Sequence, residues 1–153
     1  ELGIECTLHV DSADLVTRAA QMTQKTNQFN LTTRRYQVPD LKRFVDSTDH
    51  AVILLDYKDR FGSEGAVGLA ILDLPAGRID TFLMSCRVIG RGVEERIIGK
   101  AIELFRQRGI AKMVGEFIPT RKNGLVASFY EGQGFSLVSQ AEDGRKLYER
   151  IIS

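Results

Sequence analysis

Residues 79–109 read IDTFLMSCRVIGRGVEERIIGKAIELFRQRG, and two different spacings of apolar residues meet within this stretch. Residues 79–86 alternate, so that one face of a strand carries Phe82, Met84 and Cys86 and the other carries Thr81, Leu83 and Ser85. Helical spacing follows in Val93, Ile97, Ile98, Ala101, Ile102 and Phe105, and Gly109 is typical of a helix end. The stretch therefore predicts a strand, a glycine-containing turn and a helix.

On both sides of this stretch, strands are predicted at residues 4–10, 51–57, 66–74, 111–118, 135–139 and 146–151. Helices are predicted near residues 15–24, with Asp11 to Asp14 as the start signal, 39–45 and 123–131. The order β-α-α-β-β-β-α-β-α-β-β describes a mixed α+β domain with a largely antiparallel sheet. Three consecutive strands without helices between them exclude a doubly wound parallel sheet.

The composition fits one soluble globular domain, with 153 residues, a formal charge of +1 and no Trp. This balance argues against a nucleic-acid binder, whose phosphate contacts need a basic excess. The longest apolar run, residues 51–55, is far shorter than the ~20 residues of a membrane span. Cys6 and Cys86 are too few for a disulfide framework and favour a cytoplasmic location. Because the chain begins at Glu1 and not at Met, we expect residues 1–153 to be a single domain cut from a longer protein.

Two glycines, Gly90 and Gly92, lie in the turn between the predicted strand and helix. They let the backbone approach a ligand closely, and the N–H groups of the first helical turn suit an anion such as a pyrophosphate. Arg91 could add a charge-assisted contact to that anion. The alternative is an ordinary helix N-terminus without a ligand. A dinucleotide-binding fingerprint is excluded, because Glu95 takes the third glycine position and no early strand–helix–strand unit surrounds it.

The motif Arg87-x-x-Gly90-x-Gly92 resembles the pyrophosphate-binding signature of the GNAT acyltransferase superfamily. A second block, Asn123, Phe129-Tyr130-Glu131 and Gly134-Phe135, resembles that superfamily's second cofactor motif. The order of strands and helices also matches over nearly the whole chain. The resemblance implies a GNAT-like, three-layer acyl-CoA acyltransferase fold, with about six or seven mostly antiparallel strands and about four helices.

The resemblance also implies how coenzyme A, acetyl-CoA or a carrier-bound phosphopantetheine would bind. The pyrophosphate or phosphate would lie against the backbone of Val88, Ile89, Gly90, Arg91, Gly92 and Val93. The pantetheine amides would pair with the main chain of Leu83, Met84 and Ser85, where the central strands splay, and Asn123 would bind the pantetheine arm. Tyr130 would return a proton to the departing thiolate. The alternative for Tyr130 is a half-buried helix tyrosine with its hydroxyl at the rim.

Residues 25–36 are unusually rich in amides, hydroxyls and cations for a connection between two helices. In GNAT-like folds this connection forms one wall of the acyl-acceptor site. Amides there could bind a polyhydroxylated acyl group, and cations could bind a phosphate or a carboxylate. The predicted substrate contacts are Lys25, Asn27, Gln28, Asn30, Arg34 and Arg35. The alternative is that these polar groups cap and bridge two helix ends.

This segment, together with residues 85–92 and 119–123, closely resembles the FkbH-like family. Members of that family join a HAD-type phosphatase domain to a C-terminal GNAT-like domain. They load a glyceryl unit from 1,3-bisphosphoglycerate onto the phosphopantetheine thiol of an acyl carrier protein in polyketide biosynthesis. The similarity covers only the GNAT-like part, because the sequence contains no Asp-x-Asp-x-Thr/Val phosphatase motif. The implied partners are an acyl carrier protein, a HAD-type domain in cis and a small phosphorylated acyl donor.

Cys86 is predicted to end the central strand on the same face as Met84, directly before the glycine turn. There it is a candidate to carry the glyceryl group as a thioester before transfer to the carrier thiol. The alternative is a small buried apolar residue. Cys6 is expected to pack in the core. His9 and His50 show no ligand spacing with each other or with the cysteines, so no metal is expected.

Two other functions remain open. One is a non-catalytic docking module that keeps the pantetheine site and only recruits the carrier protein. The other is an acetyl-CoA-dependent amine N-acetyltransferase, for which Glu116 on the predicted strand 111–118 could act as the base.

Overall fold

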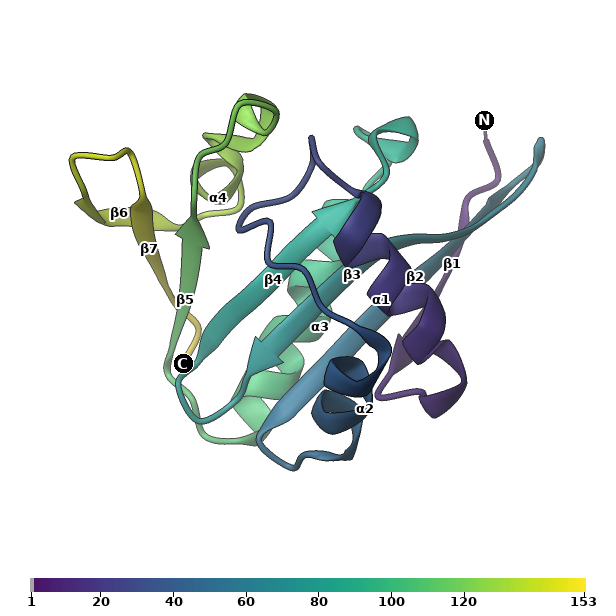
Figure 1. The fold of residues 1–153 in the computed structure, drawn as a ribbon, viewed down its shortest axis with the longest axis horizontal. Helices are drawn as coiled ribbons and strands as arrows, with labels where there is room; N and C mark the ends of the chain where they lie inside the picture. The colour runs from purple at the N-terminus through teal and green to yellow at the C-terminus, as the bar shows by residue number, and fades with distance from the viewer. Residues whose placement is uncertain (1) are drawn as a thin grey trace.

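The computed structural model describes residues 2–153 and has the element order that the sequence predicts (Figure 1). The strands of this part of the chain are β1 (Glu5–Val10), β2 (His50–Asp59), β3 (Gly62–Asp73), β4 (Arg78–Met84), β5 (Lys112–Phe117), β6 (Ser136–Gln140) and β7 (Lys146–Ile151). The α-helices are α1 (Val16–Lys25), α2 (Val38–Asp46), α3 (Val93–Gln107) and α4 (Phe129–Gly132). Short 3-10 turns, η1 (Ala13–Leu15), η2 (Cys86–Val88) and η3 (Gly124–Val126), precede α1, α3 and α4. None of the helices within residues 2–153 is long and apolar enough to cross a membrane.

The strands form a single sheet in the order β1-β2-β3-β4-β5-β7-β6. Neighbouring strands are antiparallel except β4 and β5, which run parallel. In the described chain this pair is joined at Arg78–Val114 and Ile79–Gly115, although both strands continue for several residues. The two strands therefore part after Ile79 and Gly115, and the predicted splay between the central strands is confirmed.

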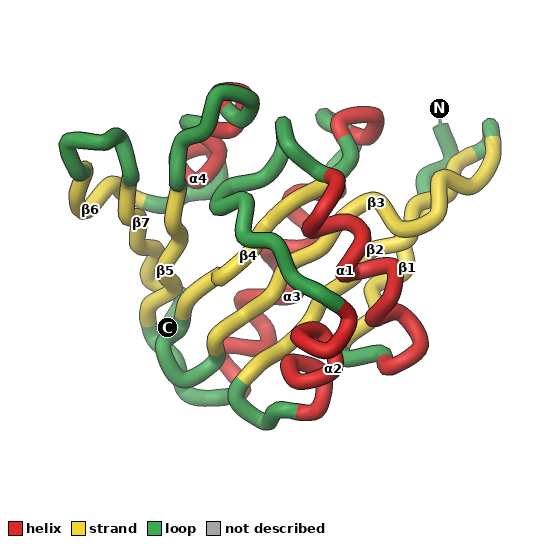
Figure 2. The backbone as a smooth tube through the Cα atoms, viewed as in Figure 1, coloured by secondary structure: helices red, strands yellow, loops and turns green. Residues whose placement is uncertain are grey.

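Helices cover both faces of the sheet: α1 and α2 lie on one face and α3 on the other (Figure 2). The apolar stripe of α3 is buried as the sequence predicts, with Ile102 only partly so. Gly68 allows α3 to pack closely on β3, because a Cβ at this position would lie 2.5 Å from Cδ1 of Ile97. α3 thus packs against β2 and β3, behind the middle of the sheet.

Some element boundaries differ from the predictions for local reasons. Asp11 does not cap the first helix; it adopts a positive φ of 54°, and its carboxylate accepts the N–H of Val52 at 2.7 Å. The hairpin of β2 and β3 turns at residues 60–61, because Asp59 Oδ1 accepts the N–H of Phe61 at 2.9 Å. Residues 62–65, which lie between the predicted strands 51–57 and 66–74, therefore belong to β3. The predicted helix at 123–131 is divided into η3 and α4.

Cys86 does not end the central strand, because β4 stops at Met84. The hydroxyl of Ser85 accepts the N–H of Arg87 at 3.3 Å and starts the turn η2. Cys86 is therefore exposed, whereas Met84 is buried.

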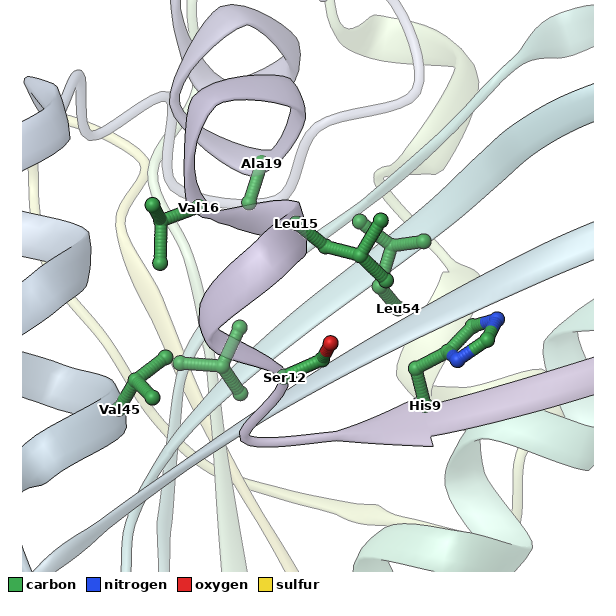
Figure 3. Close-up of a pocket in the computed structure, with 8 residues that line it drawn as sticks. His9, Ser12, Leu15, Val16, Ala19, Val45 and Leu54 are labelled. Atoms are coloured by element: carbon green, nitrogen blue, oxygen red, sulfur yellow. The ribbon is translucent and has the colours of Figure 1, made fainter.

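A small apolar recess lies where η1 and α1 meet β1 and β2, and Figure 3 shows side chains that line it, including Leu15, Val16, Val45 and Leu54. Its volume is about 10 Å³, which is room for about one water molecule. His9 lies at its edge, and Nε2 of His9 pairs with Asp56 at 2.9 Å. We assign this recess to packing and not to a ligand.

Candidate active site

The splay between β4 and β5 is bridged by residues 29–31 of the α1–α2 connection (Figure 1). Leu31 donates its N–H to the carbonyl of Phe82 at 3.0 Å, and Met84 donates to the carbonyl of Phe29 at 3.0 Å. On the other side, Ile118 donates to the carbonyl of Leu31 at 2.9 Å. Parting strands leave backbone groups without partners, and this segment supplies those partners.

The predicted contacts of the pantetheine amides fall on backbone groups of β4 that already have partners within the chain. The N–H of Met84 is bonded to Phe29, and the N–H of Ser85 is bonded to the carbonyl of Val67 at 2.7 Å. Leu83 pairs with Leu69 in the β3–β4 ladder. Pantetheine could use this edge of β4 only if residues 29–31 moved away.

Asn123 is buried, and both the nitrogen and the oxygen of its side-chain amide form hydrogen bonds within the chain. Its Nδ2 donates to the carbonyl of Asn30 at 3.0 Å and to that of Ile118 at 2.9 Å. Its Oδ1 accepts the N–H of Thr120 at 2.8 Å. A pantetheine arm at Asn123 would therefore have to replace one of these hydrogen bonds, and the predicted contact stays a prediction. Asn123 joins the α1–α2 connection to the end of β5.

In residues 25–36, three of the six predicted substrate residues, Asn27, Asn30 and Arg35, form hydrogen bonds within the segment, as the capping alternative expects. Asn30 donates to the carbonyl of Thr26 at 3.1 Å and accepts the N–H of Thr33 at 2.9 Å. Arg35 donates to the carbonyl of Thr26 at 2.8 Å and to Oδ1 of Asn27 at 2.6 Å, at the end of α1. The carbonyls at a helix C-terminus lack intrahelical partners and favour a cation. Lys25 and Gln28 remain exposed.

Arg34 does not join the other cations, because it belongs to a charged network across the splay. It contacts Asp80 on β4 at 3.4 Å and Glu116 on β5 at 3.3 Å. Arg78 also contacts Glu116, at 3.0 Å, and the hydroxyl of Tyr36 donates to Asp80 at 2.7 Å. Two guanidinium groups thus engage the carboxylate of Glu116, which makes it a poor candidate for a general base in this conformation.

Tyr130 is only 1% exposed, so the alternative of a half-buried tyrosine at the rim is wrong. Its ring lies on Gly115, where a Cβ would come within 2.7 Å of Cζ of the tyrosine. Burial, together with the negative charge of Glu116, raises the pKa of Tyr130 well above its ordinary value. Its hydroxyl has no hydrogen-bond partner among residues 2–153. This unpartnered hydroxyl lies near the splay between β4 and β5, where a group on a bound cofactor could form a hydrogen bond with it.

The glycine turn has the backbone that the motif predicts. Gly90 and Gly92 both have φ of 80°, and Gly92 is the N-cap of α3. The N–H groups of the first turn of a helix lack intrahelical partners and can bind an anion.

The side chains of the glycine turn do not favour a pyrophosphate. Arg91 contacts the hydroxyl of Tyr57 at 3.1 Å and Oδ2 of the buried Asp59 at 3.3 Å, so an anion at the turn would compete with Asp59 for this guanidinium group. Arg87 pairs with Glu64 at 3.4 Å. The first turn of α3 carries Glu94 and Glu95, and Oε1 of Glu94 is buried without a hydrogen-bond partner in the described chain. The backbone fits a phosphate, whereas the local charge opposes a dianion.

Cys86 opens onto a cavity of about 450 Å³ at the end of β4, so it is not the buried apolar residue of the alternative interpretation. Its thiol lies 3.5 Å from Oε1 of Gln28, to which it can donate. The cavity is lined by Lys25, Thr26, Asn27, Gln28, Phe29, Met84, Ser85, Cys86 and Lys122. At this cavity the fold brings together six of the predicted site residues: Lys25, Asn27, Gln28, Met84, Ser85 and Cys86.

A second cavity of about 320 Å³ shares Asn27 and Lys122 with the first. It is lined by Asn27, Thr33, Arg35, Thr120, Arg121 and Lys122. Sequence reasoning assigned no role to Arg121 or Lys122, although residues 119–123 carry part of the resemblance to the FkbH-like family. Residues 2–153 contain no group of three or more His, Cys, Asp or Glu side chains that could hold a metal ion.

No protein-family model and no curated protein matches this sequence. Solved structures do match. The GNAT domain of S. lividans PAT has a TM-score of 0.70 at 17% identity, over 95% of this chain and 90% of that chain. The ribosomal-protein-S18-alanine N-acetyltransferase from Escherichia coli has a TM-score of 0.66 at 14% identity, over 97% and 95%. The acetyltransferase yncA from Salmonella typhimurium, solved with acetyl-CoA, has a TM-score of 0.64 at 12% identity, over 97% and 94%.

The chain therefore has the GNAT acetyltransferase fold. At these identities the comparisons establish the fold alone, and the narrower resemblance to the FkbH-like family stays a prediction.

Proposed function

We propose that this domain is an acyltransferase that passes an acyl group through the thiol of Cys86 to the pantetheine thiol of a carrier protein. The observation that carries the proposal is that Cys86 opens onto a cavity of about 450 Å³ that also contains Lys25 and Lys122. By contrast, Arg34 and Arg78 engage the carboxylate that an amine acceptor would need. The resemblance to the FkbH-like family makes a glyceryl unit the expected acyl group and an acyl carrier protein the expected acceptor.

The chemistry requires two exchanges at Cys86. The sulfur of Cys86 attacks the acyl carbon of the donor, forms a thioester and expels the donor's leaving group with its electron pair. The carrier thiol then attacks this thioester and takes the acyl group, and its proton passes to the departing sulfur, which restores the Cys86 thiol. Lys25 and Lys122 supply positive charge in the same cavity, which stabilises an anionic donor or leaving group. Gln28, 3.5 Å from the sulfur, is placed to bind a hydroxyl of a glyceryl chain.

An acetyl-CoA-dependent N-acetyltransferase is the second candidate, and the similar solved structures favour it, since they include enzymes named as N-acetyltransferases. The yncA structure holds acetyl-CoA. The unpartnered hydroxyl of Tyr130 near the splay also fits this function, in which it would protonate the departing thiolate. This route requires residues 29–31 to leave the β4 edge and Glu116 to lose its two arginine contacts.

Intact-mass measurement tests the proposal. The chain is incubated with a glyceryl thioester of N-acetylcysteamine, and the same experiment is run on Cys86→Ala and, as the matched control, on Cys6→Ala. Cys6 is partly buried on β1, and burial raises the pKa of its thiol, so we expect it to stay unmodified. A glyceryl adduct should form on the native chain and on Cys6→Ala, should be absent from Cys86→Ala, and should pass to holo carrier protein on addition.

Three results would overturn this proposal. An adduct that persists in Cys86→Ala would move the reaction to another residue. Carrier binding without any adduct would leave a docking module, and acetylation of polyamines or peptide amines from acetyl-CoA without an adduct would establish the second candidate.

A further inference from the structure

The two cavities beside Cys86 share a wall and form one cationic trough, which we define by Lys25, Arg35, Arg121 and Lys122. We propose that this trough, and not the glycine turn before α3, binds the phosphate group of the substrate. The inference rests on the proposed function in one respect: the phosphate is that of the pantetheine arm or of the acyl donor that reaches Cys86.

The charge of the trough is uncompensated. Its four cations come from two separate parts of the chain, the α1–α2 connection and the loop after β5. Lys25, Arg121 and Lys122 form no ion pair with any of residues 2–153, and all three are exposed. Arg35 donates only to neutral carbonyl and amide oxygens, so its positive charge also persists.

Carboxylates do not oppose these cations within the trough. Among the described residues, neither cavity is lined by an Asp or a Glu. The nearby neutral groups are hydroxyls and amides, including Thr33, Thr120 and Asn27, which can hydrogen-bond to phosphate oxygens. Several unpaired cations with neutral donors around them favour a ligand with two negative charges.

At the glycine turn before α3, in contrast to the trough, the arginines are paired with carboxylates. Arg91 is engaged by Asp59, and Arg87 is engaged by Glu64. Glu94 and Glu95 add two further acidic groups to the first turn of α3. A phosphate at this turn would gain backbone N–H groups but would meet several carboxylates nearby, whereas the trough offers positive charge without that repulsion.

The position of the trough suits the proposed reaction. Lys122 and Asn27 line both cavities, and Lys25 lies with Cys86 in the larger one. Figure 1 shows that the α1–α2 connection, η2 and the loop that leads to η3 rise at the same edge of the sheet, where β4 and β5 end. A phosphate held between Arg121 and Lys122 therefore leaves the rest of the ligand free to extend toward the thiol of Cys86.

Calorimetry of the full chain tests this inference with 4′-phosphopantetheine as the probe. The double variant Arg121→Gln/Lys122→Gln should weaken binding about tenfold or more, because it removes two charge-assisted contacts. The matched control, Arg87→Gln/Arg96→Gln, also removes two exposed charges, one at the glycine turn and one on α3, and should leave the affinity within about twofold. Thermal unfolding of both variants verifies that the fold is kept.

Three further binding measurements identify the group that the trough binds, and they distinguish a failure of this inference from a failure of the proposed function. Pantetheine without its phosphate should bind the native chain and the Arg121/Lys122 variant equally. Comparing 3-phosphoglycerate with 4′-phosphopantetheine identifies the source of the phosphate, and either ligand supports the trough if its binding depends on Arg121 and Lys122. Cys86→Ser should retain phosphate binding even though acyl transfer is lost. Affinity that falls in the Arg87/Arg96 variant and not in the Arg121/Lys122 variant would overturn the inference.

Discussion

Replacing Asn123 by alanine should lower the free energy of unfolding by about 3 kcal/mol, at about 1 kcal/mol for each hydrogen bond lost. The amide makes hydrogen bonds to the carbonyls of Asn30 and Ile118 and to the N–H of Thr120. In Asn123→Ala, three backbone groups on two separate segments lose their partner where solvent access is poor, which makes the loss costly. Urea unfolding followed by circular dichroism measures the change.

The control for this prediction is Ser128→Ala, in the same loop region. Ser128 is exposed and its side chain makes no capping hydrogen bond to α4, so the free energy of unfolding should change by less than about 0.5 kcal/mol. Asn123→Asp should be at least as harmful as Asn123→Ala, because it replaces two N–H donors by oxygens that face carbonyls. If Asn123→Ala kept nearly full stability and instead lost affinity for 4′-phosphopantetheine, Asn123 would be a ligand contact after all.

The fold could be predicted because its determinants are local. Alternation in residues 79–86 and the helical stripe that begins at Val93 are repeated patterns that follow from which side chains must face the core. The two glycines before α3 require positive φ, which few other residues adopt, and both have it. These features place β4, the turn and α3 without any knowledge of what packs against them.

The candidate site could be predicted only in part, because it depends on pairs that are distant in sequence. Arg91 and Asp59 are 32 positions apart, and Arg34 and Glu116 are 82 positions apart. A motif indicates that an arginine is present near an anion site, but it does not reveal which carboxylate of the folded chain pairs with that arginine. The motif therefore predicts the turn that carries Arg91, but it does not predict the pairing of Arg91 with Asp59.

Residues 25–36 show the same limit of sequence patterns, because some polar side chains that suggest a binding site form hydrogen bonds within the fold instead. Amides and cations are unusually frequent there, yet the carbonyls at the end of α1 need hydrogen-bond donors. Arg35 and Asn30 satisfy those needs, whereas Lys25 does not take part and remains available. Lys122 completes the trough from a loop that is about a hundred residues away in sequence, which only the fold could reveal.

Replacing Tyr130 by phenylalanine should raise the free energy of unfolding by about 1 kcal/mol, because it removes a buried hydroxyl that lacks a partner within residues 2–153. The neighbouring Tyr148 provides a matched control with the opposite expected sign. Its ring centre is 5.7 Å from that of Tyr130, and its hydroxyl donates to Oε1 of Glu131 at 2.8 Å. Tyr148→Phe should therefore lower the free energy of unfolding by about 1 kcal/mol. Urea unfolding of both variants, under identical conditions, measures the two signs.

The rate of acyl transfer in Tyr130→Phe separates the two candidate functions. Tyr130 is buried and is not among the residues that line the cavity of Cys86, so transfer through Cys86 should stay within about threefold of the native rate. In the N-acetyltransferase mechanism the same hydroxyl protonates the departing thiolate, and its loss should slow acetylation about a hundredfold. A stabilised Tyr130→Phe variant with native transfer through Cys86 would show that this hydroxyl is not needed for that route. A stabilised variant that is a hundredfold slower would instead mean that the splay opens during the reaction and admits the thioester to Tyr130.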